Sequence, residues 1–181
     1  MNISYIDFWG GFSPEDFWFS RFFRSLLNGK EVYFTSPEEA DVIIGSCFGN
    51  SISRYPNVKA KKILWIGENQ RPSYQYYDYS LTFDYDSYDG RNIRLPLWLM
   101  YIDWWGDNSE DISLTELHTI FNPEDIYNRQ NFCSIVIGNP VSNRLDLVRE
   151  LNSYKIVDTF GAAFNNRFDG RKLDLLKNYR Y

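Results

Sequence analysis

The sequence predicts an α/β fold built on a parallel sheet, and three observations support this. Short apolar segments rich in β-branched residues recur from Asn2 to Ile66. Helical or irregular segments separate them, which is typical of parallel strands joined by crossovers. Two of the apolar segments, at 42–44 and 62–66, are continuous enough to be buried on both faces. We therefore expect a Rossmann-like sheet, in which ligands bind at the carboxyl ends of the strands.

The first strand and helix are predicted from residues 2–29. Residues 2–8 form an apolar run that ends at Gly10-Gly11. Ser13-Pro14-Glu15-Asp16 then predicts a helix start, with Ser13 as the N-cap, proline at the first helical position and two acids in the first turn. Phenylalanine and leucine side chains at helical spacing continue this helix, and Asn28-Gly29 predicts its end.

Further strands are expected at residues 31–35, 41–46 and 62–66, and at 80–83 within an irregular stretch rich in Tyr and Asp. An apolar run at 95–101 leads into a polar segment between about 103 and 129, which we interpret as a linker. A second α/β unit is expected after it, with a strand at 133–137, a helix at 142–152 and a strand around 155–157. The sequence therefore predicts two domains, residues 1–125 with the linker and an incomplete domain at 126–181.

Composition and charge limit the kinds of ligand that the protein can bind. The chain has 181 residues, of which 44% are hydrophobic and 24% charged, so it can bury a core and should fold. Its net charge of −5 and its scattered basic residues argue against binding to nucleic acid or to anionic membranes. An anionic ligand would have to be bound by a local group of helix amides and one or two arginines.

Cysteine and histidine usage indicates neither a zinc site nor a disulfide framework, because Cys47, Cys133 and His118 lack the necessary spacing. Asp84-Tyr85-Asp86 spells D-x-D, which can coordinate a divalent metal, but three common residues are weak evidence. No apolar run reaches the roughly 18 residues of a membrane-spanning helix, and no leader peptide is evident. The sequence therefore predicts a cytoplasmic protein.

Several segments match the motifs of a known family in order and in spacing. They are Phe8-Trp9 with Phe12, residues 61–69 (KKILWIGEN), Arg71-Pro72, residues 78–84 (DYSLTFD), residues 94–98 (RLPLW), Phe132-Cys133-Ser134, and residues 154–158 (YKIVD) with Gly161 and Asn165-Asn166. In this arrangement the chain resembles the α-1,3/1,4-fucosyltransferase family, a group of inverting glycosyltransferases.

The resemblance implies a glycosyltransferase type B fold with two Rossmann-like domains. The N-terminal domain would bind the oligosaccharide acceptor and the C-terminal domain GDP-fucose. By the same resemblance, Glu68 in the G-E-N motif is the general base that removes a proton from the acceptor hydroxyl. A carboxylate at a strand end can also be a simple cap or surface ion pair, and this reading remains open.

The resemblance also suggests binding residues. Asn139 and Arg144 would contact the donor diphosphate, where Arg144 lies in the first turn of the expected helix. Family members usually have Ser-Asn at this turn, so Gly138 is a departure. Apart from the resemblance, Asp78 and Tyr79, together with Tyr76 and Tyr77, are candidate acceptor contacts, because aromatic rings stack on sugar rings and carboxylates accept hydrogen bonds from hydroxyls. Packing of their loop explains these residues about equally well. The family implies no cofactor and no metal, only the sugar-nucleotide donor.

The chain ends at Tyr179-Arg180-Tyr181, where the family has a Y-K-F motif followed by its main donor-binding segments. The resemblance therefore implies an apparently truncated fucosyltransferase that acts on a glycan containing N-acetylglucosamine or glucose. Three alternatives stay open. The chain could be an inactive fragment, an acceptor-side module that needs a second polypeptide for the donor half, or a carbohydrate-binding protein.

Overall fold

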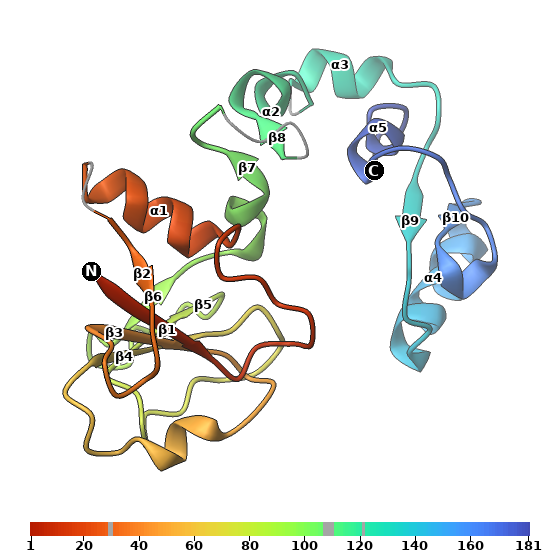
Figure 1. Ribbon diagram of the computed structural model, residues 1–181. Helices are drawn as coiled ribbons and strands as arrows, with labels where there is room; N and C mark the ends of the chain where they lie inside the picture. The colour runs from red at the N-terminus through yellow and green to blue at the C-terminus, as the bar shows by residue number, and fades with distance from the viewer. Residues whose placement is uncertain (29–30, 107–110, 121) are drawn as a thin grey trace. The chain divides into compact units, whose positions relative to one another are not determined.

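A computed structural model describes residues 1–28, 31–106, 111–120 and 122–181. The chain divides into two compact units, Met1–Ile102 and Asp103–Tyr181 (Figure 1). The predicted α/β class with a parallel sheet is confirmed. The predicted domains, 1–125 and 126–181, remain a prediction. The compact unit that contains the main sheet ends earlier, at Ile102.

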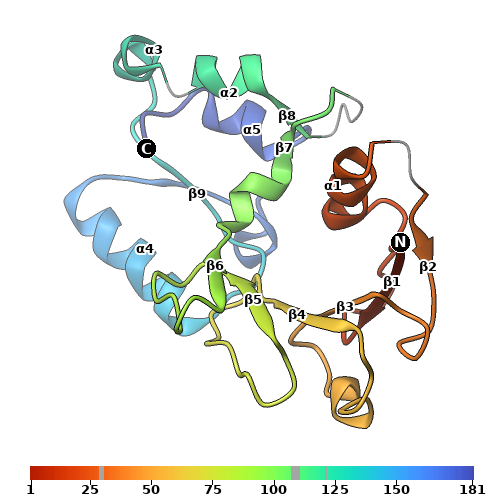
Figure 2. The same cartoon turned by 90° about the vertical axis from the view of Figure 1, so that its left-hand side faces the viewer.

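The first unit contains a six-stranded sheet in which every neighbouring pair is parallel. Its strands are β1 (Asn2–Ile6), β2 (Tyr33–Phe34), β3 (Val42–Gly45), β4 (Lys61–Trp65), β5 (Tyr79–Thr82) and β6 (Asn92–Arg94). The order is β2-β1-β3-β4-β5-β6, and Figure 2 shows β4, β5 and β6 following one another. Five of these strands lie within or beside the predicted segments, whereas β6 was not predicted.

The first helix, α1 (Trp18–Leu26), starts later than the sequence predicted. The expected N-cap Ser13 instead donates its hydroxyl to the carboxylates of Glu15 and Asp16, so its oxygen caps no helix amide. The N-cap position of α1 is Phe17, whose side chain cannot accept a hydrogen bond from the helix amides. The predicted stop at Asn28-Gly29 lies partly outside the described residues, and Asn28 has a left-handed φ of 45°.

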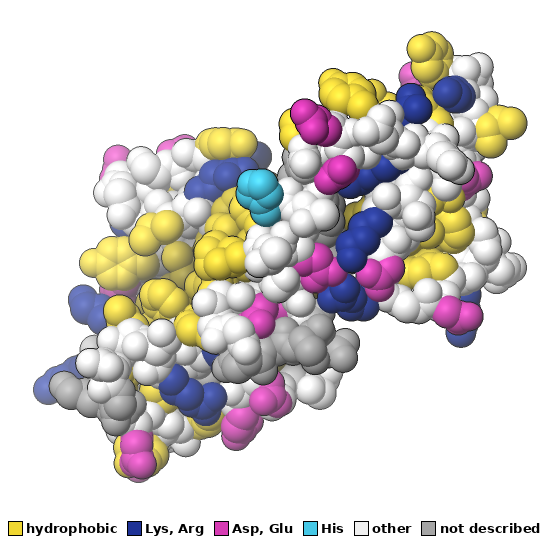
Figure 3. All heavy atoms as spheres, turned by 90° about the horizontal axis from the view of Figure 1, so that it is seen from above, with side chains coloured by type: hydrophobic (Ala, Val, Ile, Leu, Met, Phe, Trp, Pro, Cys, Tyr) yellow, Lys and Arg dark blue, Asp and Glu magenta, His cyan; other side chains and the backbone are white. Residues whose placement is uncertain are grey.

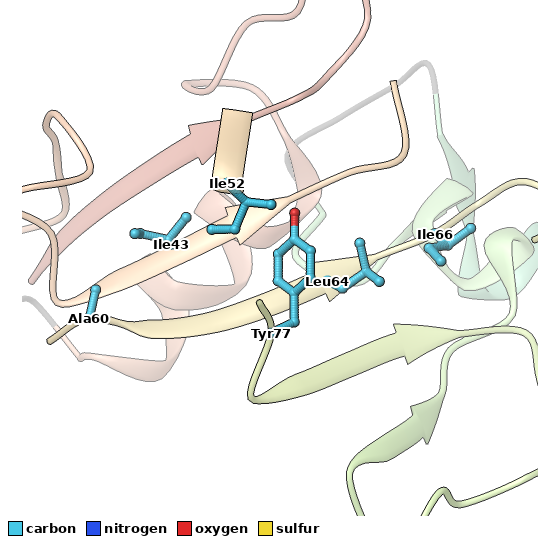
Figure 4. Packing of buried hydrophobic residues seen from close by; sticks show 6 residues of the cluster. All are labelled: Ile43, Ile52, Ala60, Leu64, Ile66 and Tyr77. Atoms are coloured by element: carbon cyan, nitrogen blue, oxygen red, sulfur yellow. The ribbon is translucent and has the colours of Figure 1, made fainter. Parts of the chain in front are cut away.

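Apolar side chains cover both faces of this sheet, because successive strand residues point in opposite directions. Ile43 belongs to one buried cluster and its neighbour Ile44 to the other. The first cluster is closed by the short helix η1 (Ser51–Arg54) and by the ring of Tyr77, which lies between the β-strand residues in Figure 4. The second is closed by α1 and by η2 (Leu97–Tyr101), and α1 and η1 lie on opposite sides of the sheet in Figure 1.

The second unit has a small parallel pair of strands, β9 (Ser134–Val136) and β10 (Asp158–Phe160), joined by α4 (Ser142–Tyr154). It also contains β8 (Ile112–Ser113), α2 (Leu114–Ile120), α3 (Pro123–Asn128), η3 (Ala162–Phe164) and α5 (Lys172–Leu176). The short strand β7 (Ile102–Asp103) pairs with β8. The segment expected to be a linker thus contains two helices.

The strand predicted at 155–157 was wrong in position. Lys155 is the C-cap of α4, and the pairing of β10 with β9 starts only where the Asp158 amide donates to the Cys133 carbonyl. The reason is local, since the Val157 amide donates to the Asn152 side chain at 2.8 Å rather than to a strand.

Large apolar side chains also lie on the surface. Yellow hydrophobic patches are visible between charged side chains in Figure 3. In the first unit, Trp98 and Tyr101 of η2 are both 57% exposed.

Within the part of the chain that the structure describes, we find no helix with both the length and the apolar character needed to cross a membrane.

Candidate active site

The candidate site lies at the carboxyl edge of the six-stranded sheet. After β1 the chain crosses to β2 on one side, and β3 then lies on the other side of β1. The crevice beside such a reversal is where open parallel sheets bind their ligands. The loops that reach this edge follow β1, β3, β4 and β5, and they begin at Asp7, Ser46, Ile66 and Phe83.

Glu68 follows β4, which lies between β3 and β5 and is largely buried. The hydrogen bonding between β4 and β5 continues one residue beyond β4, because the Ile66 amide donates to the Leu81 carbonyl at 3.1 Å. Gly67 packs closely here, since a Cβ atom at this position would lie 3.3 Å from Leu97 Cδ1 and from Trp65 Cζ2. Glu68 itself is exposed, and its carbonyl accepts the Gln70 amide at 2.7 Å. A carboxylate is therefore presented at the end of a rigid strand.

The loop after β3 lies near this carboxylate. Partial burial raises the pKa of the Cys47 thiol, and the negative charge of Glu68 raises it further. Burial raises the pKa of Tyr77 as well, with further contributions from Asp7 and Cys47. Raised pKa values favour the protonated thiol of Cys47 and the protonated phenol of Tyr77.

Two exposed aromatic rings stand at the same edge. Trp9 is 41% exposed and Phe48 is 50% exposed, and their centroids lie 5.9 Å apart at an interplanar angle of 82°. Trp9 also lies 6.2 Å from Trp65, the last residue of β4. Sequence reasoning did not identify this pair as a site, although both residues follow predicted strands. The signal that could have identified them is an aromatic residue a few positions beyond each of two neighbouring strand ends.

The structure does not bring Asp78 and Tyr79 to this edge. Tyr79 pairs with Ile63, five positions before Glu68, which along a strand corresponds to a distance on the order of 15 Å. The Asp78 carboxylate accepts the Lys62 amide at 2.8 Å, so it holds the amino edge of the sheet together. The acceptor role of these two residues stays a prediction that their position does not favour.

The D-x-D segment does reach the carboxyl edge, since Asp84 follows β5. Its Oδ2 atom accepts the Tyr88 hydroxyl at 2.7 Å and lies 2.9 Å from the Arg71 guanidinium. The Tyr88 hydroxyl, aided by Arg71, holds the pKa of Asp84 below its ordinary value. Among the residues that the structure describes, no group of three or more His, Cys, Asp or Glu side chains is arranged to bind a metal.

Asn139 and Arg144 lie in the second unit, between β9 and the first turn of α4. The Asn139 carbonyl accepts the Val141 amide at 3.0 Å, which closes the turn that leads into the helix. The residue before α4 is Val141, which provides no side-chain cap, and the first turn contains no acid. Asn139 and Arg144 are both exposed at this helix end. The first amides of a helix and an arginine in its first turn are groups that can bind an anion.

Fold and site define a parallel α/β protein with an exposed carboxylate at the carboxyl edge of its sheet, and comparisons with known proteins identify its family. Residues 3–101 match the family described as the alpha-(1,3)-fucosyltransferase FucT N-terminal domain. The chain therefore belongs to the α-(1,3)-fucosyltransferase FucT family. The matched residues cover almost all of the first unit.

Individual relatives agree with this assignment. An alpha-(1,3)-fucosyltransferase FucT of Helicobacter pylori is 23% identical in an alignment 149 residues long, which covers 75% of this chain and 30% of the relative. A crystal structure of an α1,3-fucosyltransferase matches 99% of this chain and 59% of its own at a TM-score of 0.68 and 20% identity. One with GDP-fucose matches at a TM-score of 0.63 and 22% identity. This chain therefore spans less than two thirds of the length of these relatives.

Proposed function

We propose that this chain serves in the transfer of fucose from GDP-fucose to a hydroxyl of a glycan that contains N-acetylglucosamine or glucose. The observation that carries the proposal is the exposed carboxylate of Glu68 at the carboxyl end of β4, within the domain that matches the family. Supporting it, one solved structure of similar fold contains GDP-fucose.

In the proposed reaction, Glu68 accepts the proton of the acceptor hydroxyl as its oxygen attacks the anomeric carbon of fucose. The bond between that carbon and the diphosphate breaks, and GDP leaves with the electron pair. Attack from the face opposite the leaving group inverts the anomeric centre. This chemistry needs a base within hydrogen-bond reach of the hydroxyl. Because Glu68 directly follows a buried strand, its backbone is held in a fixed position.

The acceptor would lie against Trp9 and Phe48, the aromatic pair at the same edge as Glu68. Aromatic faces are suited to the apolar face of a sugar ring. Asp78 and Tyr79 remain predicted acceptor contacts, but one sugar unit at Glu68 would not extend to them.

On the donor side, we propose that Asn139, Arg144 and the first amides of α4 bind the diphosphate. A guanidinium provides charge-assisted hydrogen bonds that suit phosphate oxygens, worth about 1.5–3 kcal/mol each. The proposal needs no metal ion, because these cationic and amide groups would offset the charge of the departing GDP.

The test is fucose transfer from GDP-fucose to N-acetyllactosamine by the protein as it is expressed from its own gene. Glu68→Gln should lower turnover by roughly 10²- to 10⁴-fold and leave GDP affinity nearly unchanged. Glu38→Gln, an exposed glutamate before β3, is the matched control and should change neither. Arg144→Ala should instead weaken GDP binding. Turnover of Glu68→Gln close to that of Glu38→Gln would exclude Glu68 as the base, and glycan binding without any transfer would favour the carbohydrate-binding alternative.

A further inference from the structure

The loop that contains Glu68 is short, and both of its ends are fixed. On the strand side, Gly67 packs against Trp65 and Leu97. On the far side, the Arg71 guanidinium lies 2.9 Å from Asp84 Oδ2 and 5.9 Å from the centroid of the Phe83 ring. The three residues between these ends include the exposed Glu68. The direction of its carboxylate therefore depends on how firmly Arg71 is held.

Asp84 is a firmly held partner for that arginine. Its side chain is only 12% exposed, whereas that of Arg71 is 65% exposed. The Tyr88 hydroxyl donates to the same Oδ2 atom at 2.7 Å, and the Asp84 amide donates to Thr82 Oγ1 at 3.0 Å. The carboxylate is thus fixed through its side chain and through its backbone.

This anchor continues into the core of the sheet. Thr82 is fully buried, and its hydroxyl donates to Asn92 Oδ1 at 3.0 Å, an atom that also accepts the Ser80 hydroxyl at 2.8 Å. The Asn92 amide group donates in turn to the carbonyls of Asp84 and Asp86. A satisfied buried network of this kind is rigid. Asp84 is therefore connected to β5 and β6, and Arg71 connects the Glu68 loop to Asp84.

The parallel register explains why these residues meet. Trp65 is paired with Leu81, so the chain leaving β4 and the chain leaving β5 run beside each other beyond the strand ends. Glu68 is three residues past Trp65, and Asp84 is three residues past Leu81. Arg71, three residues past Glu68, can therefore extend its side chain to Asp84 in the neighbouring loop.

We propose that the Arg71–Asp84 ion pair positions Glu68, by holding the far end of its loop so that the carboxylate points at the acceptor. Arg71 and Asp84 are positioning residues in this scheme and do not touch the reacting atoms. The inference rests on the proposed function of Glu68. Misplacing a reacting group by about 1 Å can cost up to roughly 100-fold in rate, so a loose loop should be visible in turnover.

The experiment compares Arg71→Met, which removes the charge and keeps the length, with Arg71→Lys, which keeps a cation. Fucose transfer by the protein from its own gene should show turnover reduced about 10- to 100-fold in Arg71→Met, with the KM for GDP-fucose changed less than about twofold. Arg71→Lys should restore most of the turnover. Asp84→Asn, which keeps an acceptor for the Tyr88 hydroxyl, should behave like Arg71→Met.

Arg149→Met is the matched control, because Arg149 forms an exposed ion pair with Asp146 at 2.6 Å on α4. Exposed ion pairs contribute little to global stability, so neither Met variant should change the urea midpoint much. Amide hydrogen exchange adds a readout without substrate. The amides of residues 67–71 should exchange at least about tenfold faster in Arg71→Met and at the wild-type rate in Arg149→Met.

Wild-type turnover in Arg71→Met, together with a loss in Glu68→Gln, would overturn this inference and leave the proposed function standing. Wild-type turnover in Glu68→Gln would overturn the proposed function and, with it, the positioning role. Unchanged exchange at residues 67–71 in Arg71→Met would overturn the inference whatever the turnover.

Discussion

Among the described glycines of the first unit, Gly45 has the least room for a side chain, and its substitution should be costly. It is the last residue of β3, and the ring of Tyr77 lies directly over it. A Cβ atom at Gly45 would lie 2.8 Å from both Cε1 and Cζ of Tyr77 and would also clash with its hydroxyl. Tyr77 is only 8% exposed and belongs to the buried cluster of Figure 4, so the ring cannot move without displacing its neighbours.

The magnitude of Gly45→Ala follows from two opposing effects. Overpacking a dense core costs about 1–3 kcal/mol. Replacing a strand glycine by alanine recovers about 0.5–1 kcal/mol of chain entropy. We therefore expect a net loss of about 1–2 kcal/mol in the free energy of unfolding, measured by urea denaturation with tryptophan fluorescence as the probe. Gly10→Ala is the control, because nothing lies within 4 Å of a Cβ atom there.

A double-mutant cycle identifies the cause. Tyr77→Leu removes the Cε1, Cζ and hydroxyl atoms that an alanine at Gly45 would meet. In that background, Gly45→Ala should cost less than about 0.5 kcal/mol, which leaves a coupling energy of about 1 kcal/mol or more. If Gly45→Ala is as mild as Gly10→Ala, or equally costly with and without Tyr77, the close approach of Tyr77 does not determine the choice of glycine.

Two further predictions concern the second unit. Gly161 has a φ of 101°, and a Cβ atom there would lie 2.5 Å from the Ile137 carbonyl oxygen. Gly161→Ala should therefore lower the free energy of unfolding by about 3 kcal/mol or more, measured by urea denaturation. Gly138→Ala is the control and should be nearly neutral, because nothing lies within 4 Å of a Cβ atom there. Lys177 and Arg171 hold the pKa of Glu116 below its ordinary value of 4.5. Because the folded-state pKa is the lower one, this stabilisation is present above about pH 4.5 and is lost as the pH falls below it. Glu116→Gln should therefore destabilise the unit by about 1 kcal/mol at pH 7 in urea denaturation, and a difference from wild type that persisted undiminished at pH 3 would contradict this assignment.

How far the sequence predicted the fold depends on how each element is stabilised. Strands β1, β3 and β4 are predictable because they bury continuous apolar runs, and this property is visible in the sequence. Strand β6 was not predicted, because Asn92 is polar and the next two residues are exposed. Its place in the sheet depends on buried hydrogen bonds from Ser80 and Thr82 to Asn92. Such partners are recognised only when the neighbouring strand is known.

The start of α1 shows the same limit at shorter range. The sequence Ser13-Pro14-Glu15-Asp16 suits a helix start, but a serine hydroxyl can either accept a helix amide or donate to a nearby carboxylate. In this chain it donates. The sequence gives both options and does not decide between them, so boundaries are less predictable than the existence of the helix.

For the site, sequence reasoning could anticipate Glu68 because a motif and a strand end coincide there. It placed Arg71 and Asp84 in two separate segments that match the family, and Asp84 also in a weak metal motif, but it did not pair them, since they are thirteen positions apart and nothing local connects them. Their contact is a consequence of the register between β4 and β5. A prediction of which strands are neighbours would be needed to find it.

The two ends of this sheet are built from different chemistry, and the difference supports the placement of the site. At the amino edge, charged side chains bind backbone: the Asp78 carboxylate accepts the Lys62 amide, and the Arg91 guanidinium donates to the carbonyls of Tyr77 and Asp78. Polar groups used in this way have little capacity left for a ligand. At the carboxyl edge, Glu68 and the exposed faces of Trp9 and Phe48 lie within reach of solvent. A sugar needs a hydrogen-bond acceptor for its hydroxyls and an aromatic face for its ring, and in the first unit the carboxyl edge offers both.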